Sequence, residues 1–267
     1  MMRRSWPAAV IILWGVFALF GGWMGLSPNH IELPKILVEP GMDALLGYDD
    51  LGRPLWDRLV AGAQTSFLVA ILVVSASLVL GTTIGVVSAY LGGWWDHVIV
   101  RIIDIFLAFP GILLAITLAG LLGPGINNVV IALSVVGWVG FARLARAQVL
   151  SIKHREHILA AHSLGTRPPT IIWRHLIPLI MAPLIVESTF AVAGAVISEA
   201  GLSFLGLGVQ PPEASWGSMI RDGARYLLVA PHMVLVPGVA LMLVVLAVNL
   251  LGDQLRDRLD VRNQERR

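Results

Sequence analysis

Three histidines lie close together in the middle of the chain, at His154, His157 and His162. Histidine is the commonest metal-binding side chain, and His154 and His157 are one helical turn apart. His162, however, would point about 140° away from His157 around a helix, and no carboxylate joins the three cleanly. We therefore interpret these histidines as part of a solvated basic face, and we predict no metal site.

Motifs for two further kinds of chemistry are missing from the sequence. There is no G-x-x-x-x-G-K-[ST] segment, the backbone-and-lysine cradle that binds nucleotide phosphates. There is no G-x-S-x-G segment for a serine nucleophile, and the absence of cysteine rules out a thiolate nucleophile or a disulfide. We expect a non-catalytic protein without a cofactor, which takes its energy from a partner or from an ion gradient.

Three carboxylates lie within apolar stretches or at the end of one, and a charge costs roughly 2.5–3.5 kcal/mol at the membrane centre. Asp104 is one helical turn from Arg101, so an ion pair near the interface accounts for it. Glu187 lies deeper in its stretch, and two interpretations stay open: a side chain that lines a pathway, or a buried structural hydrogen bond. Glu199 lies at the end of the same stretch, where we expect a structural or gate residue.

The stretches that carry these carboxylates are the elements that must position them. Of the 267 residues, 57% are hydrophobic and only 13% are charged, against about 45–50% and 25% in soluble domains. This composition excludes a soluble enzyme, a disordered regulator and a nucleic-acid-binding domain. We predict an all-α integral membrane protein with six transmembrane helices, since six apolar stretches are long enough to span a bilayer. They cover residues 7–26, 66–91, 98–122, 127–145, 179–197 and 233–251.

The distribution of basic residues predicts the orientation of these helices. With both the N-terminus and the C-terminus in the cytoplasm, most of the 19 Lys and Arg residues fall on the cytoplasmic side. The first stretch has no convincing small-residue cleavage site after it, so we expect a signal anchor rather than a cleaved signal peptide. The predicted organisation is an N-terminal anchor helix with an extracytoplasmic loop, a core permease domain with two long loops, and a cytoplasmic tail. The anchor helix and its loop cover residues 1–65. The core domain covers 66–252, with its long loops at 148–178 and 199–231, and the tail covers 253–267.

The loop 148–178 is the most polar stretch in the middle of the chain. The spacing predicts a helix over Ser151–Leu164, which Gly165 ends, and a second short helix that Thr166 caps. Pro168 and Pro169 then fall in the first turn of the second helix, and the final proline ends the segment. This loop has two interpretations: a basic loop that sets the topology, or a helix-turn-helix that docks a cytosolic partner.

The second interpretation is favoured by a resemblance. Ala160-Ala161, the glycine that follows and His175-Leu176-Ile177-Pro178 resemble the signature loop of ABC importer permeases, in which Glu-Ala-Ala is followed by Gly and an apolar-Pro end. Leu159 stands where that family usually has Glu. The resemblance implies that this loop couples the protein to an ATPase through five residues: Glu156, Ala160, Ala161, Gly165 and Pro178.

Longer motifs resemble permeases of the dipeptide, oligopeptide and nickel class. They comprise 48–53 with Arg58 and Gly62, then 199–208 with 210–212 and 215–217, and finally 249–260. The resemblance implies the type I ABC importer permease fold in the bacterial inner membrane. It also implies partners: a second homologous permease, two ABC ATPase subunits, an extracytoplasmic binding protein and the lipid bilayer, but no nucleic acid.

Contact with the binding protein is expected from Asp49, Asp50, Arg53 and Trp216. Trp216 has a simpler interpretation as an anchor at the membrane interface. The predicted function is to form, with a second permease, the pathway for peptides or a related small solute, nickel included. The binding protein delivers the solute and the ATPases drive alternating access. The alternative is an ion-coupled secondary transporter with Glu187 or Asp104 as its proton carrier.

Overall fold

The computed structural model describes residues 5–42 and 44–259, and within them the regular structure is helical. Two isolated bridges, Gly41 with Ala44 and Tyr48 with Pro54, are the sheet-like pairings of these residues. Helices are the expected outcome of long apolar runs, because a helix satisfies every backbone hydrogen bond within its own segment. The fold class predicted from the sequence is confirmed in this respect.

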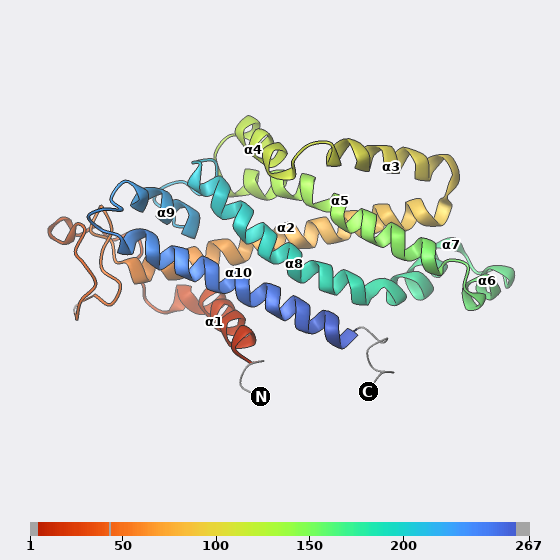
Figure 1. Ribbon diagram of the computed structural model, residues 1–267, viewed down its shortest axis with the longest axis horizontal. Coiled ribbons are helices and arrows are strands. Elements are labelled where there is room, and N and C mark those ends of the chain that lie inside the picture. Colours follow the sequence, from red (N-terminus) through yellow and green to blue (C-terminus); the bar gives the residue numbers. More distant parts are fainter. Residues whose placement is uncertain (1–4, 43, 260–267) are drawn as a thin grey trace.

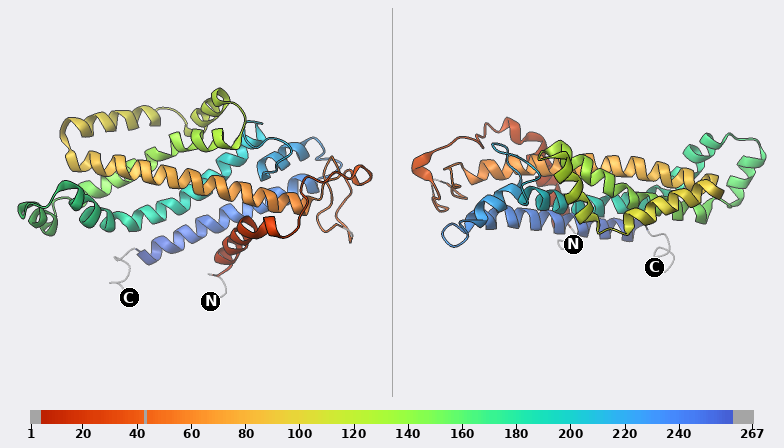
Figure 2. Two further views of the ribbon diagram at one scale, coloured as in Figure 1. Left: turned by 180° about the vertical axis from the view of Figure 1, so that it is seen from behind. Right: turned by 90° about the horizontal axis from the view of Figure 1, so that it is seen from above.

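Four long helices run side by side and form the body of the molecule (Figure 1). They are α2 (Leu55–Leu91), α5 (Ile126–Ile152), α8 (Ile177–Phe204) and α10 (His232–Leu259). Each is long and apolar enough to cross a membrane, as is α1 (Trp6–Phe20) together with the 3₁₀ turn after it. α1 and α10 lie along one edge of the bundle, and the segment between α2 and α5 lies along the opposite edge (Figure 2).

That segment consists of two helices, α3 (Gly93–Leu107) and α4 (Gly111–Leu122), which are bent by 85° relative to each other. The single helix predicted over 98–122 is therefore corrected to a broken one. Pro110 explains the break, because it has no N–H for the helix ladder and excludes a helical conformation from the residue before it. The bundle has six spans only if this bent pair counts as one.

Close packing of α2 on α5 rests on Gly81 and Gly85. A side chain at Gly81 would collide with the carbonyl oxygen of Trp138, and one at Gly85 would collide with that of Ala142. The two glycines therefore allow the backbones to touch, which is the usual role of small residues four apart in membrane helices.

Helix ends differ from the predicted ones where polar residues continue a helix beyond the apolar stretch. α2 begins at Leu55 rather than at 66, and α10 continues to Leu259. The helix predicted over Ser151–Leu164 is divided, because α5 runs on to Ile152 and a turn precedes α6 (Glu156–Ser163).

Two further predictions for this loop are wrong. Arg167, not Thr166, occupies the N-cap position of α7 (Pro168–Ile171), and Pro168 and Pro169 lie in its first turn as expected. Pro178 does not end the segment, since the chain passes through a π-helical turn (Ile172–Leu176) straight into α8. Without an N–H, Pro178 cannot bond to the carbonyl of Arg174, and the wider turn accommodates this gap.

Candidate functional sites

Four of the five predicted coupling residues belong to an exposed knob at one end of the bundle, which consists of α6 and α7 with the turn between them (Figure 1). Glu156 and Ala160 are exposed on α6, and Ala161 is half-buried. Ile158 is 3% exposed and packs α6 against the body of the molecule. Pro178 lies apart from this group, exposed in the first turn of α8.

Gly165 ends α6 as the sequence predicts. Its φ of +76° is in the left-handed region, where glycine is favoured. Its N–H donates to the carbonyl of His162 at 3.0 Å, and the Thr166 N–H donates to that of Ala161 at 3.1 Å. These two bonds are a Schellman motif, which fixes the direction in which the chain leaves the helix.

The surface around α6 carries exposed apolar side chains. Leu159, which replaces the usual Glu, is 47% exposed, Leu164 is 86% exposed and Trp173 is 70% exposed. Leu159 and Leu164 belong to the knob, whereas Trp173 lies in the π-helical turn after α7. Exposed large apolar side chains on a protrusion are typical of a protein contact. The histidines near α6 are exposed as well, and the described residues contain no group of three or more metal-binding side chains.

An ion pair near the C-terminal end of α5 could not be foreseen from the sequence. Arg146 donates from Nε and Nη2 to the two carboxylate oxygens of Asp96, both at 2.7 Å. Ser88 donates to the same carboxylate at 2.7 Å, and Lys153 Nζ donates to the carbonyl of Ala89 at 3.0 Å. These contacts join α2, α3 and α5 immediately before the knob.

Glu187 lines a cavity of about 570 Å³ between α5, α8 and α10. Gln148 and Arg256 line the same cavity, so a carboxylate, an amide and a guanidinium face one space. Glu187 and Arg256 form no ion pair with each other among the described residues. Both charges remain able to meet a ligand.

Asp104 lies away from that cavity, on α3. Its Oδ2 is 3.8 Å from Nη1 of Arg101, and the two side chains are 54% and 83% exposed. The predicted pairing with Arg101 is confirmed. The structure therefore does not bring Asp104 and Glu187, the two candidate proton carriers, together.

Glu199 is 1% exposed at the end of α8 near α9 (Trp216–Ala224). Ser66 of α2 donates to its Oε2 at 3.0 Å, and Ser203 donates to its Oε1 at 2.7 Å. The N–H of Val209 donates in turn to Ser203 Oγ at 3.2 Å. Glu199 thus ties α2 to α8 and to the loop after it.

Trp216 is 2% exposed, and its Nε1 donates to the carbonyl of Leu59 at 3.0 Å. Its ring lies against Gly62, where a Cβ would come within 2.7 Å of it. Both interpretations of this side chain needed exposure, to lipid headgroups or to a binding protein. The structure instead places it inside the subunit, between α9 and α2.

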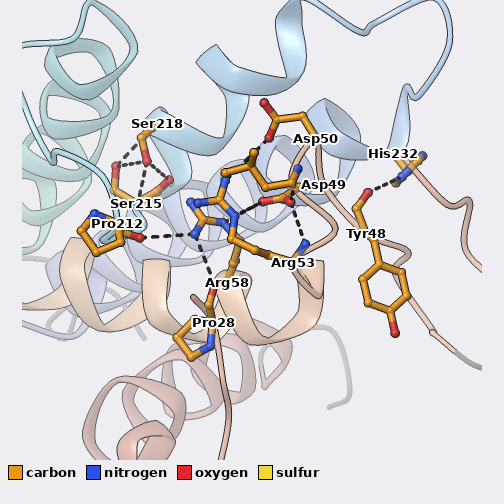
Figure 3. Close-up of polar contacts among 11 residues, drawn as sticks. Pro28, Tyr48, Asp49, Asp50, Arg53, Arg58, Pro212, Ser215, Ser218 and His232 are labelled. Carbon is orange, nitrogen blue, oxygen red and sulfur yellow. Dashed lines mark hydrogen bonds and ion pairs between the residues drawn. The ribbon is translucent and has the colours of Figure 1, made fainter. Parts of the chain in front are cut away.

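Asp49, Arg53 and Arg58 form a buried network beside α9 (Figure 3). The Asp49 carboxylate lies 2.6 Å from Arg53 Nε and 3.3 Å from Arg58 Nε. Arg58 Nη1 also donates to the carbonyls of Pro28 and Pro212, at 3.3 and 3.4 Å. Its guanidinium therefore holds together the loop before α2 and the loop before α9.

Asp50 is the more exposed acid of this network, with 26% of its side chain accessible and Arg53 Nη2 at 3.6 Å. Burial raises the pKa of the Asp50 carboxyl, and the neighbouring charge of Asp49 raises that pKa further. Asp49 and Arg53 are 3% and 6% exposed. Of the residues expected to contact a binding protein, only Asp50 has an appreciably exposed side chain.

Comparison with known proteins agrees with this architecture. Residues 81–264 match the family described as "Binding-protein-dependent transport system inner membrane component". The chain belongs to this family. The permease is thus a component of a transport system in the inner membrane, and the family gives no support to an ion-coupled secondary transporter.

The permease has relatives of similar length. It is 40% identical over 255 residues to "Glutathione transport system permease protein GsiD" of Escherichia coli O6:K15:H31, covering 95% of this chain and 84% of that protein. It is 43% identical over 221 residues to "Dipeptide transport system permease protein DppC" of Alkalihalophilus pseudofirmus, covering 83% and 73%.

Its fold is similar to that of a chain in the inward-facing MetNI methionine ABC transporter, in the CY5 native crystal form. The TM-score is 0.64 with 18% sequence identity, over 77% of the permease and 98% of that chain. The likeness shows the type I ABC importer permease fold.

Proposed function

We propose that the permease forms half of the pathway of an ABC importer that takes up small peptides. Relatives at 40% and 43% identity are permeases for glutathione and for dipeptides, and this similarity is the observation that carries the proposal. Its partners in the proposal are a second permease, two ATPase subunits and an extracytoplasmic binding protein. ATP hydrolysis belongs to the ATPases, since this chain has no phosphate-binding cradle.

The proposed orientation puts α6 in the cytoplasm and α9 outside, with both chain ends in the cytoplasm. The basic stretch around α6 supports it through the positive-inside rule. Because the chain has no cysteine, single cysteines test it directly. Asn29→Cys and Asn127→Cys, both at exposed positions, should react with an impermeant thiol reagent added outside. Labelling of Ser163→Cys from outside sealed cells would contradict this orientation. Ser215 is buried and makes a poor reporter.

In this proposal the knob of α6 and α7 receives the motion of an ATPase. α5 runs into the knob and α8 leaves it through the π-helical turn, so a movement of the knob acts on both helices. The pair of Asp96 and Arg146 extends that movement to α3. A rigid docked element converts domain closure into helix movement in this way.

The cavity around Glu187 is proposed as the cytoplasmic part of the pathway. A peptide at neutral pH carries an ammonium group at one end and a carboxylate at the other. Glu187 attracts the first and Arg256 attracts the second, and both line the same space. At the outer side, the buried Asp49 network shapes the loops that meet the binding protein, while Asp50 is available for direct contact.

Uptake by reconstituted vesicles tests the function. The permease would be purified with its partner permease and ATPases, inserted into liposomes and supplied with binding protein and labelled glutathione or dialanine. We expect uptake that requires ATP inside and stops with a hydrolysis-deficient ATPase. Uptake driven by a proton gradient without ATP would instead establish the secondary-transporter alternative.

A further inference from the structure

A second cavity, of about 270 Å³, lies where the broken pair of α3 and α4 meets the bundle. Its walls come from four helices, α2, α4, α5 and α8, and consist mostly of apolar side chains and glycines. The residues that line it include two serines, Ser77 and Ser198, and the first two residues of α4, Gly111 and Ile112. None of the residues that line it is charged.

The first two residues of α4, Gly111 and Ile112, line this cavity and precede the first backbone hydrogen bond of the helix. The carbonyl of Pro110 accepts the N–H groups of Leu113 and Leu114, at 3.0 and 3.1 Å. The N–H groups of Gly111 and Ile112 come before that first bond and have no backbone acceptor in the described part of the chain. The first N–H groups of a helix carry its positive end, and they favour an anion.

Ser77 supplies an independent observation. Its side chain is 2% exposed, and its Oγ has no hydrogen-bond partner among the described residues. Serine in a helix commonly donates back to a carbonyl of the preceding turn, and Ser77 does not. Gly137 of α5 leaves room for this hydroxyl, since a Cβ there would come within 2.5 Å of the Oγ.

The cavity lies deep in the bundle. A Cβ placed on Gly111 would be 3.2 Å from Cγ1 of Val136, and Val136 is near the middle of α5. A half-helix that begins at mid-membrane and points its N-terminus at a cavity is a known way for transport proteins to hold the carboxylate of a substrate.

We propose that this cavity binds the terminal carboxylate of the transported peptide, through Ser77 and the N–H groups of Gly111 and Ile112. The inference rests on the proposed function, which supplies a peptide as the ligand. All of the donors are neutral, so the anion is held without a buried lysine or arginine and can leave again, as a transport site requires. The apolar walls accommodate a small side chain next to the carboxylate.

Thiol chemistry tests the proposal on the assembled complex. The Ser77→Cys variant would be treated with two methanethiosulfonates of similar size, one bearing a sulfonate and one a trimethylammonium group. Labelling of this chain would be followed by mass. We expect the anionic reagent to be favoured about fivefold relative to a control, the size of a helix-terminus interaction. The control is Ser75→Cys, exposed on the same helix.

Ligand protection makes the test specific for a carboxylate. Dialanine should slow labelling of Ser77→Cys, whereas the same peptide with a C-terminal amide should not. Ser134→Cys provides the second control, because Ser134 is also buried and unpartnered but does not line the cavity. Equal protection by both peptides, or equal reagent preference at positions 75 and 77, would overturn the carboxylate site.

Uptake separates this inference from the proposed function. If the unaltered complex imports no peptide with ATP, the proposed function fails. If it imports dialanine but labelling shows no anion preference, only the carboxylate site fails. Ser77→Ala should raise the KM for dialanine about fivefold at normal complex recovery, and Ser75→Ala should leave it unchanged.

Discussion

Asp96 and Arg146 are 50 positions apart in sequence and form a two-point ion pair, with both N–O distances at 2.7 Å. The side chains are 15% and 28% exposed, so water screens the pair only partly. It joins the first turn of α3 to the last part of α5, at the end of the bundle that carries α6. A contact at that place holds α3 to α5, the helix that leads to α6.

Removing one partner of this pair should destabilise the permease. Asp96→Asn leaves the Arg146 guanidinium without its counter-charge, at a cost of about 1–3 kcal/mol. We expect earlier thermal unfolding in detergent, and ATP hydrolysis that is less well coupled to uptake. Arg101→Gln is the matched control, since the Arg101–Asp104 pair is at 3.8 Å and exposed, and such pairs contribute little. Equal effects of the two variants would show that the partly buried pair of Asp96 and Arg146 has no special role.

The knob of α6 and α7 should be sensitive to shape and charge. Gly165→Val forces a β-branched residue into a left-handed conformation, which is strained at the φ of +76° found here. The variant should therefore misdirect α7. Ala161→Glu should place an unpaired charge in the ATPase contact and weaken it by a few kcal/mol, on the order expected for a desolvated charge. Complex recovery, ATPase rate and uptake would be measured together. Normal uptake by both variants would leave this loop as a topology determinant only.

Space near Gly165 helps to separate these effects. Apart from its two chain neighbours, no described residue has an atom within 4 Å of a Cβ placed there, so Gly165→Ala tests the backbone conformation without a collision. We expect uptake by Gly165→Ala to be higher than uptake by Gly165→Val but lower than uptake by the unaltered protein.

Glu187→Gln should alter transport while leaving assembly intact, because the side chains are nearly isosteric and the cavity around them is open. We expect a higher KM for peptide with ATPase activity maintained. Arg256→Gln, at the other side of the cavity, should weaken uptake of a free-acid peptide more than that of its C-terminal amide. Loss of stability together with transport would indicate that Glu187 is only structural.

Acid should affect the loop before α2 through Asp50. Because burial and Asp49 raise the pKa of the Asp50 carboxyl, its folded-state pKa lies above the unfolded one. Its contribution to loop stability is then fully present below the unfolded pKa and decreases as the pH rises through the folded pKa. Asp50→Asn, a mimic of the protonated form, should remove this pH dependence. Protease cleavage in loop 27–54, followed across acidic pH, would measure it, and an unchanged profile would contradict this assignment.

The sequence predicted those conformations of the permease that depend on neighbouring residues in the chain. The left-handed Gly165 and the prolines at the start of α7 follow from the residues themselves, and the conformations agree. The burial of Trp216 depends instead on Gly62, more than 150 positions away, and no local pattern reports that. The bond between Asp96 and Arg146 is equally non-local. Pro110 is a sequence signal for the break in the third span. The long apolar run around it nevertheless favoured the prediction of a single helix.

The π-helical turn at Ile172–Leu176 lies along the chain between the knob of α6 and α7 and the cavity of Glu187. It accommodates one residue more than an α-helical turn. If a push on α7 shifted that extra residue along the helix, the segment it passed would rotate by about 100° and advance by about 1.5 Å. The knob would then rotate part of α8 about its own axis rather than tilt the helix. Glu187, eleven residues beyond Leu176, would turn out of the cavity once the extra residue had moved past it.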